Sequence, residues 1–184
     1  MDLDGMCDVL SYWVFSDIYE EIMFLPEPFV GGFGLITACG IKKPNFYAFK
    51  MLSKLGPYRY VLPEHTNEPV EYAVFSDSKS MQILVYAQSM VPVNEEHNVE
   101  IGINAAASSV KIARIDDKHC NPKKMWKESG AAKNLTYKQV EWINEKCKLK
   151  QKNLSFKSNI GENGSRTEFS FKLKTNDVCL ITIR

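Results

Sequence analysis

The sequence predicts an α+β protein in which a strand, a loop and a helix precede an antiparallel β-sandwich that carries a small helical insertion. Residues 8–55 contain one long apolar run, an acidic turn, a glycine-rich loop and a helical pattern. From residue 58 onward, short runs of alternating apolar and polar residues are separated by turn residues, which is typical of antiparallel sheet. We therefore expect two domains, 1–56 and 57–184.

The first domain opens with an apolar run at residues 9–15 that continues into the acidic residues Asp17, Glu20 and Glu21. A run of this kind indicates a buried parallel strand whose C-terminal end presents polar groups. Pro44 suits the first turn of a helix, and apolar residues recur at helical spacing after it until a Gly-Pro pair. Without neighbouring strands, the run would leave backbone groups and large apolar side chains unpaired.

The second domain combines strand patterns with two helical ones. Thr136 is placed to cap the second helix, and Gln139 stands in the capping-box position. The helices are expected near 122–129 and 136–148, and the strands at 71–75, 81–88, 98–104, 109–115, 154–158, 167–174 and 178–183.

Composition narrows the classes of function. The 184 residues carry 23 basic and 22 acidic side chains, a net charge of +1, which gives no basis for nucleic-acid or anionic-membrane binding and favours neutral ligands such as sugars. Five widely spaced cysteines form no metal-binding pattern, so we expect no metal and no cofactor. No stretch reaches the roughly 18 apolar residues of a membrane span. No secretion signal is visible at the N-terminus, and the expected location is cytoplasmic.

Three stretches mix rare Trp, Gly and Pro positions: YWVFSDIYEE at 12–21, PEPFVGGFGL at 26–35 and PNFYAFKML at 44–52. They resemble glycoside hydrolase family 39, which contains β-xylosidases and α-L-iduronidases, and are nearer the β-xylosidases. NPKKMW at 121–126 and LTYKQVEWI at 135–143 extend the resemblance. It implies that residues 1–56 are the last strand-helix unit of a TIM (β/α)8 barrel. A complete barrel needs about 250 residues, so we expect the other seven units to lie outside this chain.

The resemblance also implies roles for single residues. In the family, both catalytic glutamates follow earlier strands, so we expect them upstream of Met1 and expect no catalytic residue here. Trp13, Glu20 and Glu21 correspond to residues that line the pocket of the non-reducing sugar, and Phe33 is a candidate wall residue. Adjacent side chains on extended backbone point to opposite faces, so Glu20 and Glu21 suit hydrogen bonds to sugar hydroxyls better than paired acid-base catalysis. The alternatives are a core position for Trp13 and a solvated loop edge for the two glutamates.

The function predicted first is that of the C-terminal portion of a retaining β-xylosidase-like glycosidase, inactive alone, whose partner is a xyloside or related neutral sugar. A second hypothesis is a non-catalytic carbohydrate-binding or interaction module on the sandwich, with Tyr72, Phe75 and Tyr86 as candidate exposed aromatics. A third is a split glycosidase, in which a separate upstream barrel polypeptide docks on the first 55 residues. An exposed apolar patch on residues 9–15 and on the helix at 47–55 would be its physical signature.

Overall fold

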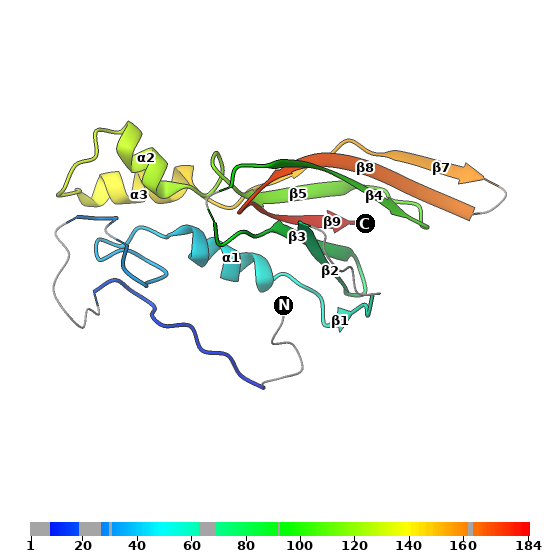
Figure 1. Cartoon of the computed structure of the whole chain (residues 1–184), viewed down its shortest axis with the longest axis horizontal. Helices are drawn as coiled ribbons and strands as arrows, with labels where there is room; N and C mark the ends of the chain where they lie inside the picture. Colours follow the sequence, from blue (N-terminus) through cyan, green and yellow to red (C-terminus); the bar gives the residue numbers. More distant parts are fainter. Residues whose placement is uncertain (1–7, 19–26, 30, 63–68, 92, 162–163) are drawn as a thin grey trace. The chain divides into compact units, whose positions relative to one another are not determined.

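The computed structural model describes residues 8–18, 27–29, 31–62, 69–91, 93–161 and 164–184. These residues form an α+β structure of antiparallel sheets and three helices, which confirms the predicted class (Figure 1). Among the described residues, none of the helices has the length and apolar character needed to cross a membrane. The helices are α1 (Pro44–Leu52), α2 (Pro122–Glu128) and α3 (Tyr137–Lys146), and the strands are β1 (Tyr58–Arg59), β2 (Val70–Ser76), β3 (Met81–Ala87), β4 (Glu96–Ile103), β5 (Val110–Ile115), β6 (Gln151–Asn153), β7 (Lys157–Gly161), β8 (Gly164–Lys174) and β9 (Val178–Ile183).

The described residues belong to two compact units. One unit draws on the ranges 1–46 and 122–146, and the other on 47–121 and 147–184. Helices α2 and α3 therefore belong to the same unit as the N-terminal residues, and both sheets belong to the other. The division of the chain at residue 56 stays a prediction.

Both sheets of the second unit are antiparallel. A six-stranded sheet has the order β1-β2-β3-β9-β5-β6, and a three-stranded sheet has the order β4-β8-β7. Strand β8 alternates strictly between buried and exposed positions, so that Thr167, Phe169, Phe171 and Leu173 are buried and the residues between them are exposed. This period of two is the pattern that identified the strand in the sequence.

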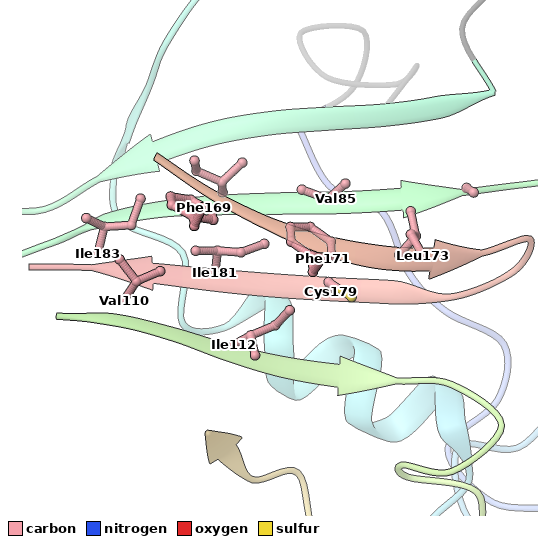
Figure 2. Packing of buried hydrophobic residues seen from close by; sticks show 11 residues of the cluster. Val85, Val110, Ile112, Phe169, Phe171, Leu173, Cys179, Ile181 and Ile183 are labelled. Atoms are coloured by element: carbon pink, nitrogen blue, oxygen red, sulfur yellow. The ribbon is translucent and has the colours of Figure 1, made fainter. Parts of the chain in front are cut away.

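The core of the second unit lies between these two sheets, which makes it the predicted β-sandwich. Phe169, Phe171 and Leu173 of β8 lie over Val85 of β3 and Ile181 of β9 (Figure 2). Because each sheet contributes apolar side chains to one shared cluster, neither can bury its inner face alone.

The six-stranded sheet is buried on its other face as well. The strand register sets Leu84 beside Leu180 and Leu180 beside Ala113, and all three side chains are buried. Tyr47 and Met51 of α1 are also fully buried, and α1 runs along the sheet (Figures 1 and 2). Burial on both faces explains why β9, with the sequence VCLITI, is almost continuously apolar instead of alternating.

The helical insertion is held together by local contacts that the sequence partly predicted. Gln139 donates its backbone N–H to Oγ1 of Thr136, and the N–H of Thr136 donates in return to Oε1 of Gln139 at 2.8 Å. The predicted capping box at the start of α3 is thereby confirmed. In α2, Trp126 is buried, its Nε1 donates to the carbonyl of Ala132 at 2.9 Å, and its ring centroid lies 5.4 Å from that of Phe29.

The buried parallel strand expected over residues 9–15 is not formed. Within the described residues 8–18, the only ladder contact is an isolated parallel bridge between Ser16 and Ile36. Val9, Leu10 and Phe15 are 81%, 73% and 64% exposed. A parallel strand requires hydrogen-bonding partners along its edges, and the described residues supply a partner only at the C-terminal end of this segment. Of the predicted strand-helix unit, the described residues therefore form the helix, α1, and not the strand.

Candidate functional site

The predicted pocket segment, residues 9–17, is anchored at its C-terminal end by the loop that follows it. The N–H of Leu35 donates to the carbonyls of Val14 and Phe15 at 3.0 Å, and the N–H of Asp17 donates to the carbonyl of Ile36 at 2.9 Å. These bonds join residues 14–17 to the chain immediately after the glycine-rich loop, 31–34. The peptide bond between Trp13 and Val14 is cis.

Asp17 is the centre of this arrangement. Its carboxylate is 7% exposed and accepts a 2.7 Å hydrogen bond from the backbone N–H of Gly34. Nζ of Lys43 lies 2.8 Å from Oδ1 and 2.9 Å from Oδ2 of the same carboxylate. The ammonium also donates to the carbonyl of Gly32 at 2.6 Å. A buried carboxylate is thus satisfied by one ammonium and one backbone N–H, as a buried charge must be.

The glycines of the loop are required by this close approach. A Cβ on Gly32 would lie 2.6 Å from Oδ1 of Asp17, and a Cβ on Gly34 would lie 2.6 Å from the same atom and 2.6 Å from the backbone carbon of Ser16. Gly31 has φ of +91°, in the left-handed region that favours glycine. The glycine-rich loop therefore wraps around a carboxylate that belongs to the protein itself.

Two candidate sugar contacts, Trp13 and Phe33, lie on this anchored frame. Both are exposed, at 59% and 74%. Tyr12, the residue before Trp13, donates its hydroxyl to the carbonyl of Phe33 at 3.0 Å and accepts from Nδ2 of Asn45 at 2.7 Å. The bond to Phe33 links the part of the chain that carries Trp13 to the loop that carries Phe33. The alternative that Trp13 is a core residue is wrong for this structure. Its role toward a sugar stays a prediction, as does that of Phe33.

Glu20 and Glu21, the other two predicted contacts, lie outside the described residues. Sequence reasoning missed Lys43, Asn45 and Tyr12, which fix the frame. Lys43 stands 26 residues after its partner Asp17, so no local spacing pattern identifies the pair.

The aromatic row considered for the sandwich does not exist as one exposed surface. Phe75 is buried, while Tyr72 is 41% exposed. The pairing of β2 with β3 sets Glu71 opposite Tyr86, so Phe75 and Tyr86 share one face of the sheet and Tyr72 lies on the other. The hydroxyl of Tyr86 donates to Oε2 of Glu71 at 2.7 Å.

The sequence profile of glycosyl hydrolases family 39 matches residues 1–163. The chain belongs to glycosyl hydrolases family 39. The match includes the pocket segment, the glycine-rich loop, α1, both helices of the insertion and most of the sandwich. The resemblance drawn from the motifs at 12–21, 26–35 and 44–52 is thereby confirmed.

Two curated relatives of this family 39 chain are β-xylosidases. The protein from Caldicellulosiruptor saccharolyticus is 31% identical over 178 residues, covering 95% of this chain and 36% of the relative. The protein from Geobacillus stearothermophilus is 30% identical over 141 residues, covering 74% of this chain and 27% of the relative. The chain therefore spans about a third of the length of the curated relatives that it matches.

The fold is shared with a solved family 39 structure. The crystal structure of the GH39 enzyme from Xanthomonas axonopodis pv. citri matches with a TM-score of 0.75 and 21% identity, over 99% of this chain and 38% of that chain. At this level of identity the match establishes a common fold over a partial region of the larger protein.

Proposed function

We propose that this chain is the C-terminal portion of a retaining, β-xylosidase-like O-glycoside hydrolase. In this proposal the first 56 residues are the last strand-helix unit of the catalytic barrel, and the remainder is the accessory sandwich with its helical insertion. The two catalytic glutamates come from preceding barrel units, so this chain alone does not cleave glycosides. Family membership and the partial coverage of the two β-xylosidases support this reading.

The observation that carries the proposal is the anchoring of the glycine-rich loop by Asp17 and Lys43. The buried ion pair fixes the loop against the pocket segment, and Trp13 and Phe33 remain exposed on the same frame. An aromatic face can stack on the apolar face of a sugar ring. A rigid backbone beneath such a platform positions it without a loss of conformational entropy on binding.

Within this frame we assign Trp13, Phe33, Glu20 and Glu21 to the non-reducing sugar. The two glutamates follow the anchored segment directly, and carboxylates form strong, charge-assisted hydrogen bonds with sugar hydroxyls. They orient the sugar, while acid-base and nucleophilic steps belong to the upstream carboxylates. The substrate of the complete enzyme is a xyloside or a related neutral sugar.

A chimera tests this assignment. The catalytic part of the C. saccharolyticus β-xylosidase that precedes the matched region is fused to this chain, and turnover of an aryl β-xyloside is measured. We expect the chimera to be active and this chain alone to be inactive. Trp13→Ala or Glu20→Gln in the chimera should lower kcat/KM by about 10- to 100-fold, since each removes a contact to the sugar. Turnover by the chain alone that disappears in Glu20→Gln would refute the proposal.

A second candidate is the smaller part of a split glycosidase, whose larger part is a separate barrel polypeptide. The exposure of Val9, Leu10 and Phe15 favours a docking partner for this segment. Mixing this chain with the separately expressed catalytic part tests the idea. Xyloside turnover that appears on mixing supports it, and turnover that requires covalent fusion contradicts it.

A further inference from the structure

A second polar groove lies in the sandwich unit, on the three-stranded sheet. Strands β4, β8 and β7 lie side by side (Figure 1), and together with residues 155–156 they line a cavity of about 810 Å³. This volume falls within the range of small-ligand sites, about 300–1,000 Å³. All of its lining residues belong to the second unit.

Small residues form the floor of the groove. The pairing of β4 with β8 sets Gly102 opposite Glu168 and Glu100 opposite Ser170, and these four side-chain positions are exposed on the outer face of the sheet. A Cβ on Gly102 would lie 3.0 Å from Nη2 of Arg166. The guanidinium of Arg166 therefore packs over Gly102, in the space that a side chain at this position would take.

Four charged side chains surround this floor, two of each sign. Lys157 of β7 pairs with Glu168 across the sheet, so Gly102, Glu168 and Lys157 form one row. Nε of Arg166 donates to Oε1 of Glu168 at 2.7 Å. Glu100 also lines the groove. The balance of charge favours neither a polyanion nor a polycation.

These groups match the chemistry of a neutral, hydroxyl-rich ligand. Carboxylates accept hydrogen bonds from hydroxyls, and guanidinium and ammonium groups donate to them, so each sugar hydroxyl can be used as both donor and acceptor. Phe156 adds one apolar wall and packs at the same time against the sandwich core. A partly apolar wall beside polar groups suits a sugar ring, which has both kinds of surface. A peptide added to a sheet edge would instead use backbone groups of an edge strand.

We propose that the groove on β4, β8 and β7 is an auxiliary binding site for a neutral oligosaccharide. Glu100 and Glu168 accept hydrogen bonds from its hydroxyls, Arg166 and Lys157 donate to them, and Phe156 contacts a ring. This site goes beyond the proposed glycosidase function, and only the choice of xylose units as the first probe rests on that function.

Isothermal titration calorimetry of the full chain with xylotetraose tests the site. Cellotetraose is the second probe. Gly102→Val fills the floor, and Lys157→Ala removes one donor from an exposed position. We expect each to weaken binding by about tenfold or more, because Lys157→Ala removes a charged hydrogen-bond donor and Gly102→Val displaces the guanidinium of Arg166. Lys172→Ala is the matched control, because Lys172 lies on the same face of β8 and pairs with Glu96 outside the groove lining.

Trp13→Ala separates this site from the predicted pocket of the first unit. Binding that survives Trp13→Ala and is lost in Gly102→Val and Lys157→Ala supports the groove, whichever of the two sugars binds. Binding that is lost in Trp13→Ala and retained in both groove variants overturns the groove site. That outcome does not contradict the proposed glycosidase function. Absence of binding of both sugars at millimolar concentration also overturns it. Circular dichroism and thermal unfolding show whether Gly102→Val folds, and Lys157→Ala decides the outcome if it does not.

Discussion

The backbone N–H of Gly34 donates a 2.7 Å hydrogen bond to the carboxylate of Asp17, which also receives the ammonium of Lys43 at 2.8 Å. Because Asp17 and Lys43 are 7% and 13% exposed, removal of one charge leaves the other buried without its partner. We expect Lys43→Met to lower the free energy of unfolding by about 3 kcal/mol, within the range for broken buried pairs. Urea denaturation measures the change.

Lys133→Met provides the matched control. Lys133 lies 3.7 Å from Glu27 in the same unit, and these side chains are 71% and 39% exposed. An exposed pair of this kind contributes little, about 0–1 kcal/mol. Equal losses in both variants would contradict the anchoring role of Lys43.

Gly34 should not tolerate a side chain. A Cβ there would overlap the backbone carbon of Ser16 at 2.6 Å, and backbone cannot move aside as a flexible side chain can. We expect Gly34→Ala to destabilise the chain by about 2 kcal/mol or more and to speed hydrogen exchange at the N–H of Leu35. Gly31→Ala in the same loop meets nothing within 4 Å and adds only the strain of its positive φ, about 1–2 kcal/mol. Faster exchange at Leu35 in Gly31→Ala alone would contradict the clash at Gly34.

Asp116 makes stability depend on pH. Burial of its carboxyl opposes ionisation, but hydrogen bonds from the N–H of Lys118 and from the ring and N–H of His119 outweigh it, so the pKa of Asp116 is lowered. A depressed carboxyl pKa stabilises the folded state above the unfolded pKa, and this contribution is lost as pH falls through the folded pKa. The advantage of the wild-type chain over Asp116→Asn should therefore be largest near pH 7, about 1 kcal/mol, and shrink below about pH 4.

Urea denaturation at several pH values measures the advantage lost in Asp116→Asn. Glu95→Gln, which removes an exposed carboxylate, serves as the control. A difference between wild type and Asp116→Asn that grows as the solution is acidified would contradict the assignment.

The cysteines should differ in reactivity. Burial raises the pKa of Cys120 and of Cys179 to about 12, and these two residues are 4% and 0% exposed, whereas Cys39 is exposed. At pH 8 a thiol with that pKa is ionised in about one molecule in ten thousand, and the thiolate is the nucleophile. Iodoacetamide should therefore modify Cys39 long before Cys120 or Cys179, as peptide mass spectrometry can show. In urea the buried thiols should react as fast as Cys39, and a fast reaction of Cys120 in the native chain would contradict its burial.

The sequence predicted most of the sandwich strands because their signals are local, but the strand expected at 154–158 lies at Lys157–Gly161. The alternation in β8 and the turn residues on either side of each run indicate strands from neighbouring residues alone. The capping box of Thr136 and Gln139 spans only three positions. Strand β6, Gln151–Asn153, was missed because its three residues are polar and exposed, and its pairing with β5 is the only thing that makes it a strand.

The candidate site could be predicted only in part. Asp17 was recognised at the end of an apolar run, but its buried partner Lys43 depends on how the chain folds back over 26 residues. The prediction of a strand at 9–15 was wrong because it relied on composition alone. The composition of this segment suits a buried strand, but burial of a parallel strand depends on neighbours along its length, and the described residues pair it only at its C-terminal end.

The exposed segment at residues 9–15 yields the prediction that best separates the chain alone from its proposed fusion with a catalytic part. Val9 and Phe15 are 81% and 64% exposed here, so Val9→Lys with Phe15→Lys should leave the urea midpoint unchanged and reduce the fluorescence of bound anilinonaphthalene sulfonate. Met90→Lys, at a residue that is 92% exposed in the other unit, is the control. In the chimera with the catalytic part, the same two lysines would be buried between strands, and we expect them to cost several kcal/mol of stability and most of the xyloside turnover. A chimera that tolerates both lysines would show that this segment does not complete the barrel.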